Sequence, residues 1–376
     1  MRIGILAPEF PPMLGGMAEL ARGLASALAE TESVRVFSFR TPPPPDDGAP
    51  SFPFPVEPMT GRPWIDGPAL AAEEDQVDLW LSLNAGSIPT AASLRQPFFA
   101  YLHGNDFINP WLRCGPRWLE SRQRPYVADL RHYLRRRAVR THLHRVRHVL
   151  TNSRQTARLI TERLGLDASR ISVAYPGVGE AFFQDREPDD GETLRILTVT
   201  RLSRHTRRKN VDGVLRALAK LGDAFPWSYT VVGDGDDRER LEDLARELGI
   251  AAQVTFLGSV SFDELLAAYR RADLFILASR ATKKDVEGFG IVYIEASAGG
   301  VPVICSREGG ATDAVRDGVN GLLIETSDPA SIAAGIERFQ ADRERFSPAA
   351  ARAMAEEFRW PKIGAQVLDI LKSRLE

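Results

Sequence analysis

Short apolar segments alternate with helical segments along almost the whole of this 376-residue chain. The apolar segments lie at 2–7, 33–39, 78–83, 97–102, 148–151, 171–174, 194–199, 228–232, 253–257, 273–277, 302–305 and 321–324. Apolar residues recur at helical spacing at 17–30, 153–164, 208–221, 236–248, 261–271, 290–299 and 328–340. Strands that alternate with helices favour parallel sheets with helices on both faces. Twelve strands are too many for one comfortable sheet, so we predict two α/β domains.

A polar segment marks the predicted boundary between these domains. Residues 184–192 carry acidic, amide and basic side chains around one proline and one glycine, which is the composition of a linker. A new strand then begins at Leu194. We therefore predict an N-terminal domain over residues 1–185 and a C-terminal domain over residues 192–359. The stretch 41–63, with nine prolines, is interpreted as an irregular excursion of the first domain.

The composition indicates a globular protein without a membrane span. Hydrophobic residues make up 44% and charged residues 26%, and no apolar run approaches the roughly 18 residues that a membrane helix needs. The apolar run that begins the chain ends at Pro8, too soon for a signal peptide. Cys114 and Cys305 lie far apart and match no metal-binding or redox spacing. We expect reduced thiols and a cytoplasmic location.

The middle of the first domain is strongly basic although the net charge of the chain is only −2. Residues 131–148 contain seven arginines, four histidines and no acid. We expect a helix that attracts anionic partners, including acidic lipid headgroups at the inner face of a membrane. The alternative is a solvated helix that balances acidic surface elsewhere. Nucleic acid is disfavoured because no recognition module accompanies the basic residues, and nothing indicates an oligomeric state.

Two carboxylates flank a glycine-bounded turn in the C-terminal third. The turn lies between Glu287 and a helix predicted to begin at Ile291, and Glu295 lies about two turns into that helix. Gly288 and Gly290 allow a ligand to approach the backbone closely. Because a helix N-terminus offers free N–H groups and a positive dipole end, the turn suits an anionic ligand such as a phosphate. The alternative is an ordinary strand–loop–helix connection.

Further candidates follow predicted strands, at the sheet edge where open α/β folds bind ligands. Gly15 and Gly16 come after the first strand without the three spaced glycines of a dinucleotide site, which disfavours a dehydrogenase. His103 follows the strand at 97–102, where its imidazole suits a hydrogen bond to a sugar hydroxyl or a leaving group.

A basic loop and a glycine turn follow strands of the second domain. Residues 201–209 contain Arg201, Lys209 and three further arginines, which suits a polyphosphate. The turn at 233–236 carries two aspartates, and Asp236 is interpreted as a helix cap and not as a metal ligand. We therefore expect no required metal ion.

Taken together, these motifs resemble glycosyltransferase family 4, the retaining nucleotide-sugar transferases of the two-domain GT-B fold. The resemblance covers nearly the whole chain and is most specific at 287–304 and 309–321. It implies two Rossmann-like domains that face a cleft, with residues 360–376 returning as a helix to the first domain. It also implies a UDP- or GDP-linked sugar as co-substrate. The residues Asp285-Val286 that lead into Glu287 are similar to those of mannosyltransferases that use GDP-mannose.

The resemblance assigns a role to each candidate. Glu287 would contact the hexose and Glu295 the ribose, Arg201 and Lys209 the diphosphate, and His103 the transferred sugar near its anomeric carbon. Backbone contacts to the donor are implied at Gly15, Gly16, Gly233, Leu257, Gly258, Val260, Phe289, Gly290 and Ile291. The predicted reaction moves a hexosyl group to a hydroxyl of a glycan, glycolipid or secondary metabolite by metal-independent front-face displacement, with the anomeric configuration retained. The alternatives are a GT-B-fold epimerase and a non-catalytic glycan-binding module.

Overall fold

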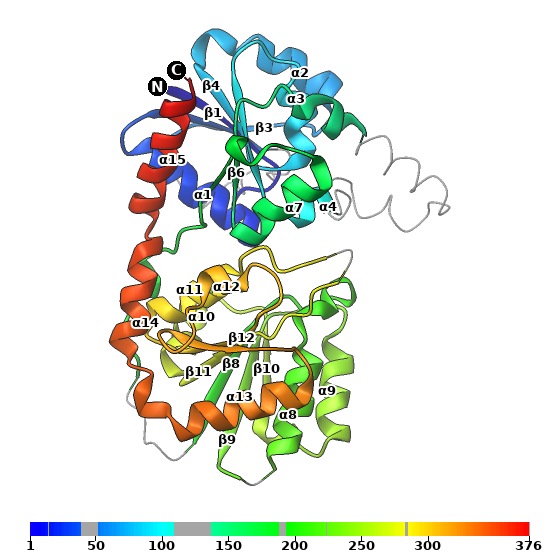
Figure 1. Cartoon of the computed structure of the whole chain (residues 1–376), viewed down its shortest axis with the longest axis vertical. Coiled ribbons are helices and arrows are strands. Elements are labelled where there is room, and N and C mark those ends of the chain that lie inside the picture. The colour runs from blue at the N-terminus through cyan, green and yellow to red at the C-terminus, as the bar shows by residue number, and fades with distance from the viewer. Residues whose placement is uncertain are drawn as a thin grey trace, which may run out of the picture. The chain divides into compact units, whose positions relative to one another are not determined.

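The computed structural model of the chain describes residues 1–13, 15–38, 52–108, 137–187, 193–222, 224–282 and 285–375. It consists of two compact units (Figure 1). The first unit comprises Met1–Gly177 and Trp360–Glu376, and the second comprises Val178–Arg359.

The boundary therefore lies earlier than the predicted limits of 185 and 192. The reason is that the segment after Gly177 hydrogen-bonds to the second unit. The Val178 N–H donates to the Phe358 carbonyl at 2.8 Å, and the Glu187 N–H donates to the Arg270 carbonyl at 2.9 Å. The polar composition predicted a linker over 184–192, and the described part of that segment is held to the second unit by the Glu187 contact.

The first unit is built on one parallel sheet covered by helices. In spatial order its strands are β3 (Val56–Pro58), β2 (Ser33–Ser38), β1 (Arg2–Ala7), β4 (Leu79–Ser82), β5 (Phe98–Leu102), β6 (Val149–Thr151) and β7 (Ile171–Val173). Its helices include α1 (Gly16–Ala29), α2 (Pro63–Ala71), α3 (Ile88–Ala91), α4 (Asn105–Ile108), α7 (Arg154–Leu164) and α15 (Trp360–Leu375). Strand β3 was not predicted.

The second unit repeats this architecture with another parallel sheet. Its strands, in spatial order, are β10 (Val254–Gly258), β9 (Trp227–Val232), β8 (Leu194–Val199), β11 (Leu274–Ile276), β12 (Val303–Ser306) and β13 (Gly321–Ile324). Its helices include α8 (Val211–Leu221), α9 (Arg238–Glu247), α10 (Phe262–Arg271), α11 (Ile291–Ala298), α12 (Ala311–Ala314), α13 (Pro329–Ala341) and α14 (Pro348–Ala355). The predicted pair of parallel-sheet α/β domains is confirmed.

The C-terminal helix completes the core of the first unit. Val367 and Leu371 of α15 are fully buried in the cluster that contains Ile5 of β1 and Leu24 of α1. Burial of an aliphatic side chain of this size contributes about 1.5–3 kcal/mol. The return of residues 360–376 to the first domain is thereby confirmed.

Small residues let α1 and α15 approach closely. A Cβ placed on Gly23 would lie 2.0 Å from the indole of Trp360, and one on Gly364 would lie 2.6 Å from the Cβ of Ala27. Neither position has room for a side chain unless the helices separate, since protein cores are close-packed.

A buried carboxylate holds together several segments at the end of the second sheet where its strands begin. The side chain of Asp273, which precedes β11, is fully buried. It accepts hydrogen bonds from Arg195 Nε and Nη2 at 2.9 Å each, and it forms ion pairs with Arg186 and with Arg343 at 3.1 Å. One charge therefore joins the start of β8, the segment after Gly177 and the segment after α13.

We expect Gly23→Ala to lower the free energy of unfolding by about 1–3 kcal/mol, because the new methyl group overpacks the contact with Trp360. Urea unfolding followed by circular dichroism measures the change. Gly16→Ala is the matched control in the same helix, since a Cβ there meets no atom within 4 Å. Equal stability of the two variants would contradict this account of the α1–α15 contact.

Candidate active site

The candidate residues of the second unit lie where its parallel strands end. Gly233 follows β9 and takes a φ of 127°, and a Cβ there would lie 1.9 Å from the Thr200 carbonyl oxygen. Its N–H donates to the carbonyl of Gly258 at 2.8 Å. The ends of β8, β9 and β10 are thus tied by backbone contacts. Beside them Leu257 is 46% exposed, and Val260 is partly buried.

The basic segment after β8 is a short helix, whereas we predicted a loop. The 3₁₀-helix η5 (Arg204–Lys209) begins with a capping box in which Ser203 and Thr206 exchange side-chain and backbone hydrogen bonds. Two of its arginines are held by neighbouring acids. The Arg204 N–H donates to Asp236 Oδ1 at 2.8 Å, and Arg207 Nε donates to Asp237 Oδ1 at 2.8 Å.

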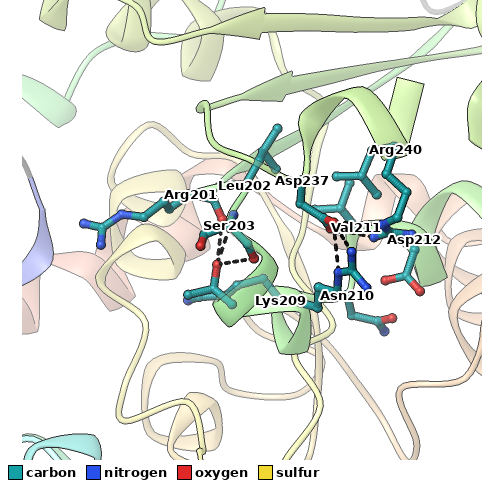
Figure 2. Close-up of a pocket in the computed structure, with 12 residues that line it drawn as sticks. Arg201, Leu202, Ser203, Lys209, Asn210, Val211, Asp212, Asp237 and Arg240 are labelled. Atoms are coloured by element: carbon teal, nitrogen blue, oxygen red, sulfur yellow. Dashed lines mark hydrogen bonds and ion pairs between the residues drawn. The ribbon is translucent and has the colours of Figure 1, made fainter. Parts of the chain in front are cut away.

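The role predicted for Asp236 is wrong in detail. The residue that caps α9 is Asp237, and its side chain makes no capping hydrogen bond. Asp236 instead binds the first residue of η5. Figure 2 shows the pocket that η5 and the start of α8 and α9 form together, with Asp237 beside Arg240 and the Arg201 side chain pointing away from both.

A left-handed asparagine ends η5 and starts α8. Asn210 is fully buried and takes φ 62° and ψ 31°, so the single helix predicted over 208–221 is interrupted there. Its amide nitrogen donates to the carbonyls of Ala278 and Ser327 at 2.8 and 2.7 Å. These bonds fix the preceding residue, Lys209, against the ends of β11 and β13.

Lys209 and Glu287 meet in a buried ionic cluster. Lys209 Nζ lies 2.6 Å from Glu287 Oε2, and Arg208 Nη1 and Ser279 Oγ donate to the same oxygen at 3.0 and 3.1 Å. Arg208 Nε also lies 2.7 Å from Asp285 Oδ2. The predicted residues Lys209 and Glu287, which are far apart in the chain, are therefore in direct contact.

The cluster sets the charge states of its members. Burial alone would raise the pKa of Glu287, but the charges of Lys209 and Arg208 hold it well below the ordinary carboxylate range. Burial lowers the pKa of Lys209 from its ordinary value, against the opposing effect of Glu287. Glu287 is consequently ionised at every pH at which the protein is expected to work.

The turn after Glu287 leads into a helix as predicted. Gly290 takes a φ of 85° and directly precedes α11, and a Cβ on it would lie 2.3 Å from the ring of Tyr293. Phe289 is buried against Phe358, with ring centroids 5.7 Å apart. The first residue of the helix is Ile291, so the positive end of the helix dipole faces the turn.

Glu295 is held by a tyrosine that sequence reasoning missed. Tyr269 of α10 donates its hydroxyl to Glu295 Oε2 at 2.8 Å. Burial raises the pKa of Tyr269 well above 10.0, which keeps the hydroxyl a donor. No motif pointed to Tyr269, because its helical spacing is that of an ordinary core residue.

In the first unit, His103 lies at the end of β5 with its imidazole fixed. Nε2 lies 2.9 Å from the Leu83 carbonyl oxygen, which can only accept, so this nitrogen carries the proton. Asp106 accepts the backbone N–H groups of His103 and Ala85 at 2.9 Å each. The carboxylate of Asp106 therefore shapes the loop around His103.

The two glycines of the first unit lie at the start of α1. Gly15 precedes the helix with a φ of 147°, and Gly16 is its first residue. The helix N-terminus predicted after the first strand is thus present.

The basic segment 131–148 lies partly outside the described residues, since 109–136 are not described, and Cys114 falls in the same gap. Within 137–148, Arg145 and Arg147 donate to the backbone carbonyls of Ala92 and Arg374. His148 is buried, and burial lowers its pKa to about 4. The contact with an anionic membrane stays a prediction. No helix in the described part of the chain is both long and apolar enough to cross a bilayer.

Known proteins match both units. Residues 14–181 match the model of glycosyltransferase family 4, and residues 180–356 match that of the glycosyl transferases group 1. The solved structure of Anabaena Alr3699/HepE in complex with UDP superposes with a TM-score of 0.76 over 99% of this chain and 100% of that chain, at 21% identity. This likeness confirms the predicted fold.

Curated relatives match about half of the chain. The GDP-mannose-dependent alpha-(1-6)-phosphatidylinositol monomannoside mannosyltransferase of Mycolicibacterium smegmatis is 37% identical over 184 residues, which are 46% of this chain and 47% of that protein. The D-inositol 3-phosphate glycosyltransferase of Acidothermus cellulolyticus is 34% identical over 207 residues, 50% of this chain and 45% of that protein. The chain thus spans about half the length of the curated relatives it matches. From the two family models, which between them span residues 14–356, the chain belongs to glycosyltransferase family 4.

Proposed function

We propose that the protein transfers a hexosyl group from a nucleotide sugar to a hydroxyl acceptor with retention of anomeric configuration. The observation that carries this proposal is the contact between Lys209 and Glu287 at the strand ends of the second unit. In a nucleotide sugar the diphosphate is bonded directly to the hexose. A site for it therefore needs a cation for the diphosphate beside a carboxylate for the sugar hydroxyls.

The donor would lie along the strand ends of the second unit. Lys209, Arg201 and the N–H groups that begin α11 suit the diphosphate, since all present positive charge or dipole. Glu287 would accept from hexose hydroxyls and Glu295 from the ribose. Gly233, Leu257, Gly258 and Val260 would line the base, and Gly15, Gly16 and His103 of the first unit would complete the contacts to phosphate and sugar.

Front-face displacement is the reaction that these residues favour. The bond between the anomeric carbon and the diphosphate oxygen breaks while the acceptor oxygen bonds to the same carbon on the same face. The acceptor proton passes to the departing phosphate, whose charge Lys209 and Arg201 stabilise. We assign Glu287 to the hexose hydroxyls, as a hydrogen-bond acceptor and not as a covalent nucleophile, and therefore propose no glycosyl-enzyme. We propose that no metal ion is required.

A guanine nucleotide with mannose is the first donor to test. Two observations support it: Asp285-Val286 precedes Glu287, and the relative with the highest identity quoted above is named as GDP-mannose-dependent. UDP-sugars are the alternative, since the solved structure quoted above is named as a complex with UDP.

We expect the cognate nucleoside diphosphate to raise the melting temperature, because a ligand at about 100 times its Kd adds about 2.7 kcal/mol to stability. Thermal-shift measurements with GDP, UDP and ADP, repeated with GDP-mannose and UDP-glucose, identify the base and sugar. Lys209→Ala should abolish the shift, whereas Arg216→Ala, which removes an exposed arginine of α8, should not. No shift with any nucleotide would contradict the proposed function.

Catalysis should depend on both charges of the central pair. We expect Lys209→Ala and Glu287→Gln each to lower kcat/KM by about 10²-fold or more, as loss of transition-state electrostatics does in other enzymes. Release of nucleoside diphosphate from the cognate donor, followed with acceptor and a chelator present, measures this. NMR of the product should show the anomeric configuration of the donor. Turnover within a few-fold of the unaltered protein in both variants, or inversion, would refute the mechanism.

The affinity for nucleoside diphosphate should fall at a lower pH than it would if the pKa of Lys209 had the ordinary lysine value. Burial lowers the pKa of Lys209 below 10.5, and only the protonated form attracts phosphate, so affinity decreases as pH rises toward that lowered pKa. Calorimetric titration of the cognate nucleoside diphosphate from pH 7 to 10 measures the effect. Lys209→Arg should flatten the profile, because a guanidinium stays charged throughout. An equally steep profile in that variant would assign the titration to another group.

A further inference from the structure

Four charged side chains of the second unit form one neutral cluster. It contains two carboxylates, Asp285 and Glu287, and two cations, Arg208 and Lys209, linked in the order Asp285–Arg208–Glu287–Lys209. The side chain of Arg208 is only 10% exposed and that of Glu287 only 8%. At this burial each charge needs an opposite charge beside it, since an unpaired ion costs several kcal/mol.

The side chains that donate hydrogen bonds to Glu287 all donate to the same one of its two carboxylate oxygens. Lys209, Arg208 and Ser279 donate to Oε2, and no described residue donates to Oε1. Oε2 is therefore the oxygen that holds the side chain in place. Oε1 remains able to accept from a hydroxyl of a bound sugar.

The two cations differ in how firmly they are held. Arg208 forms ion pairs with two carboxylates, with Asp285 at 2.7 Å and with Glu287 at 3.0 Å, and its backbone carbonyl accepts from the Arg280 N–H at 2.7 Å. Lys209 has the Glu287 oxygen as its partner in the cluster, at the end of a flexible stem. A diphosphate would compete with Glu287 for Lys209 and not for Arg208.

We propose that Lys209 turns from Glu287 to the donor diphosphate on binding, and that Arg208, anchored by Asp285, stays as the counter-ion of Glu287. This inference rests on the proposed function. Arg208 is then a positioning residue: it touches no substrate atom, but it makes Lys209 available. Without Arg208, Lys209 would be the remaining cation of the cluster beside the buried carboxylate of Glu287. Moving Lys209 away would then leave that carboxylate unpaired, which is energetically unfavourable.

The test is a set of calorimetric titrations of GDP and UDP into the full chain. Arg208→Gln should weaken nucleoside diphosphate binding about tenfold, because Lys209 is retained by Glu287. Adding Glu287→Gln to this variant should restore affinity to within about threefold of the unaltered protein, since Lys209 no longer has a carboxylate to neutralise. Arg208→Lys should also bind within about threefold, and Arg216→Gln should bind like the unaltered protein.

A merely structural role of Arg208 gives a different result. If Arg208→Gln damages the fold, the double variant binds no better than the single one, and the proposal is overturned. Unchanged affinity in Arg208→Gln overturns it too. Should Arg208→Gln not fold, Asp285→Asn is the second variant: it leaves Arg208 with Glu287 as its carboxylate partner in the cluster, so nucleoside diphosphate should bind at least as tightly as to the unaltered protein, and clearly weaker binding overturns the proposal. If the unaltered protein binds neither nucleotide, the proposed function fails, and this inference fails with it.

Discussion

The buried negative charge of Glu287 is the constraint on which the candidate site depends. A carboxylate at 8% exposure stays ionised only if cations and hydroxyls surround it. Two consecutive residues, Arg208 and Lys209, supply those cations, so η5 has to present both to the same oxygen. The left-handed turn at Asn210 and its bonds to two other strand ends hold η5 in the orientation that does so.

Backbone geometry at the strand ends is the second requirement. Gly233 donates its N–H to the Gly258 carbonyl, and its Cα lies so close to the Thr200 carbonyl oxygen that no side chain would fit there. In the turn before α11, Gly290 leaves room for the ring of Tyr293, which a Cβ would meet at 2.3 Å. Charge and close backbone approach thus occur together where parallel strands end, and this combination suits a ligand with both phosphates and hydroxyls.

Much of the fold follows from the sequence because buried parallel strands are nearly continuous apolar runs. The exception is β3, a short edge strand of partly exposed residues that follows a proline-rich stretch. Helix spacing predicted one helix over 208–221, because no pattern shows that Asn210 adopts a positive φ. The candidates Lys209 and Glu287 were predicted, but their contact was not. The turn of η5 decides that Arg208, and not Arg204 or Arg207, faces Glu287. The acids that hold the other two arginines are Asp236 and Asp237, in the loop after β9.

The C-terminal helix has a consequence for synthesis of the protein on the ribosome. Domains usually fold in order as the chain emerges, N-terminal part first. Here the first unit lacks α15, and with it part of its buried core, until translation has passed the whole second unit. The whole second unit emerges earlier. During that interval the part of α1 that packs against α15 has no cover, so the N-terminal half is the part expected to need a chaperone.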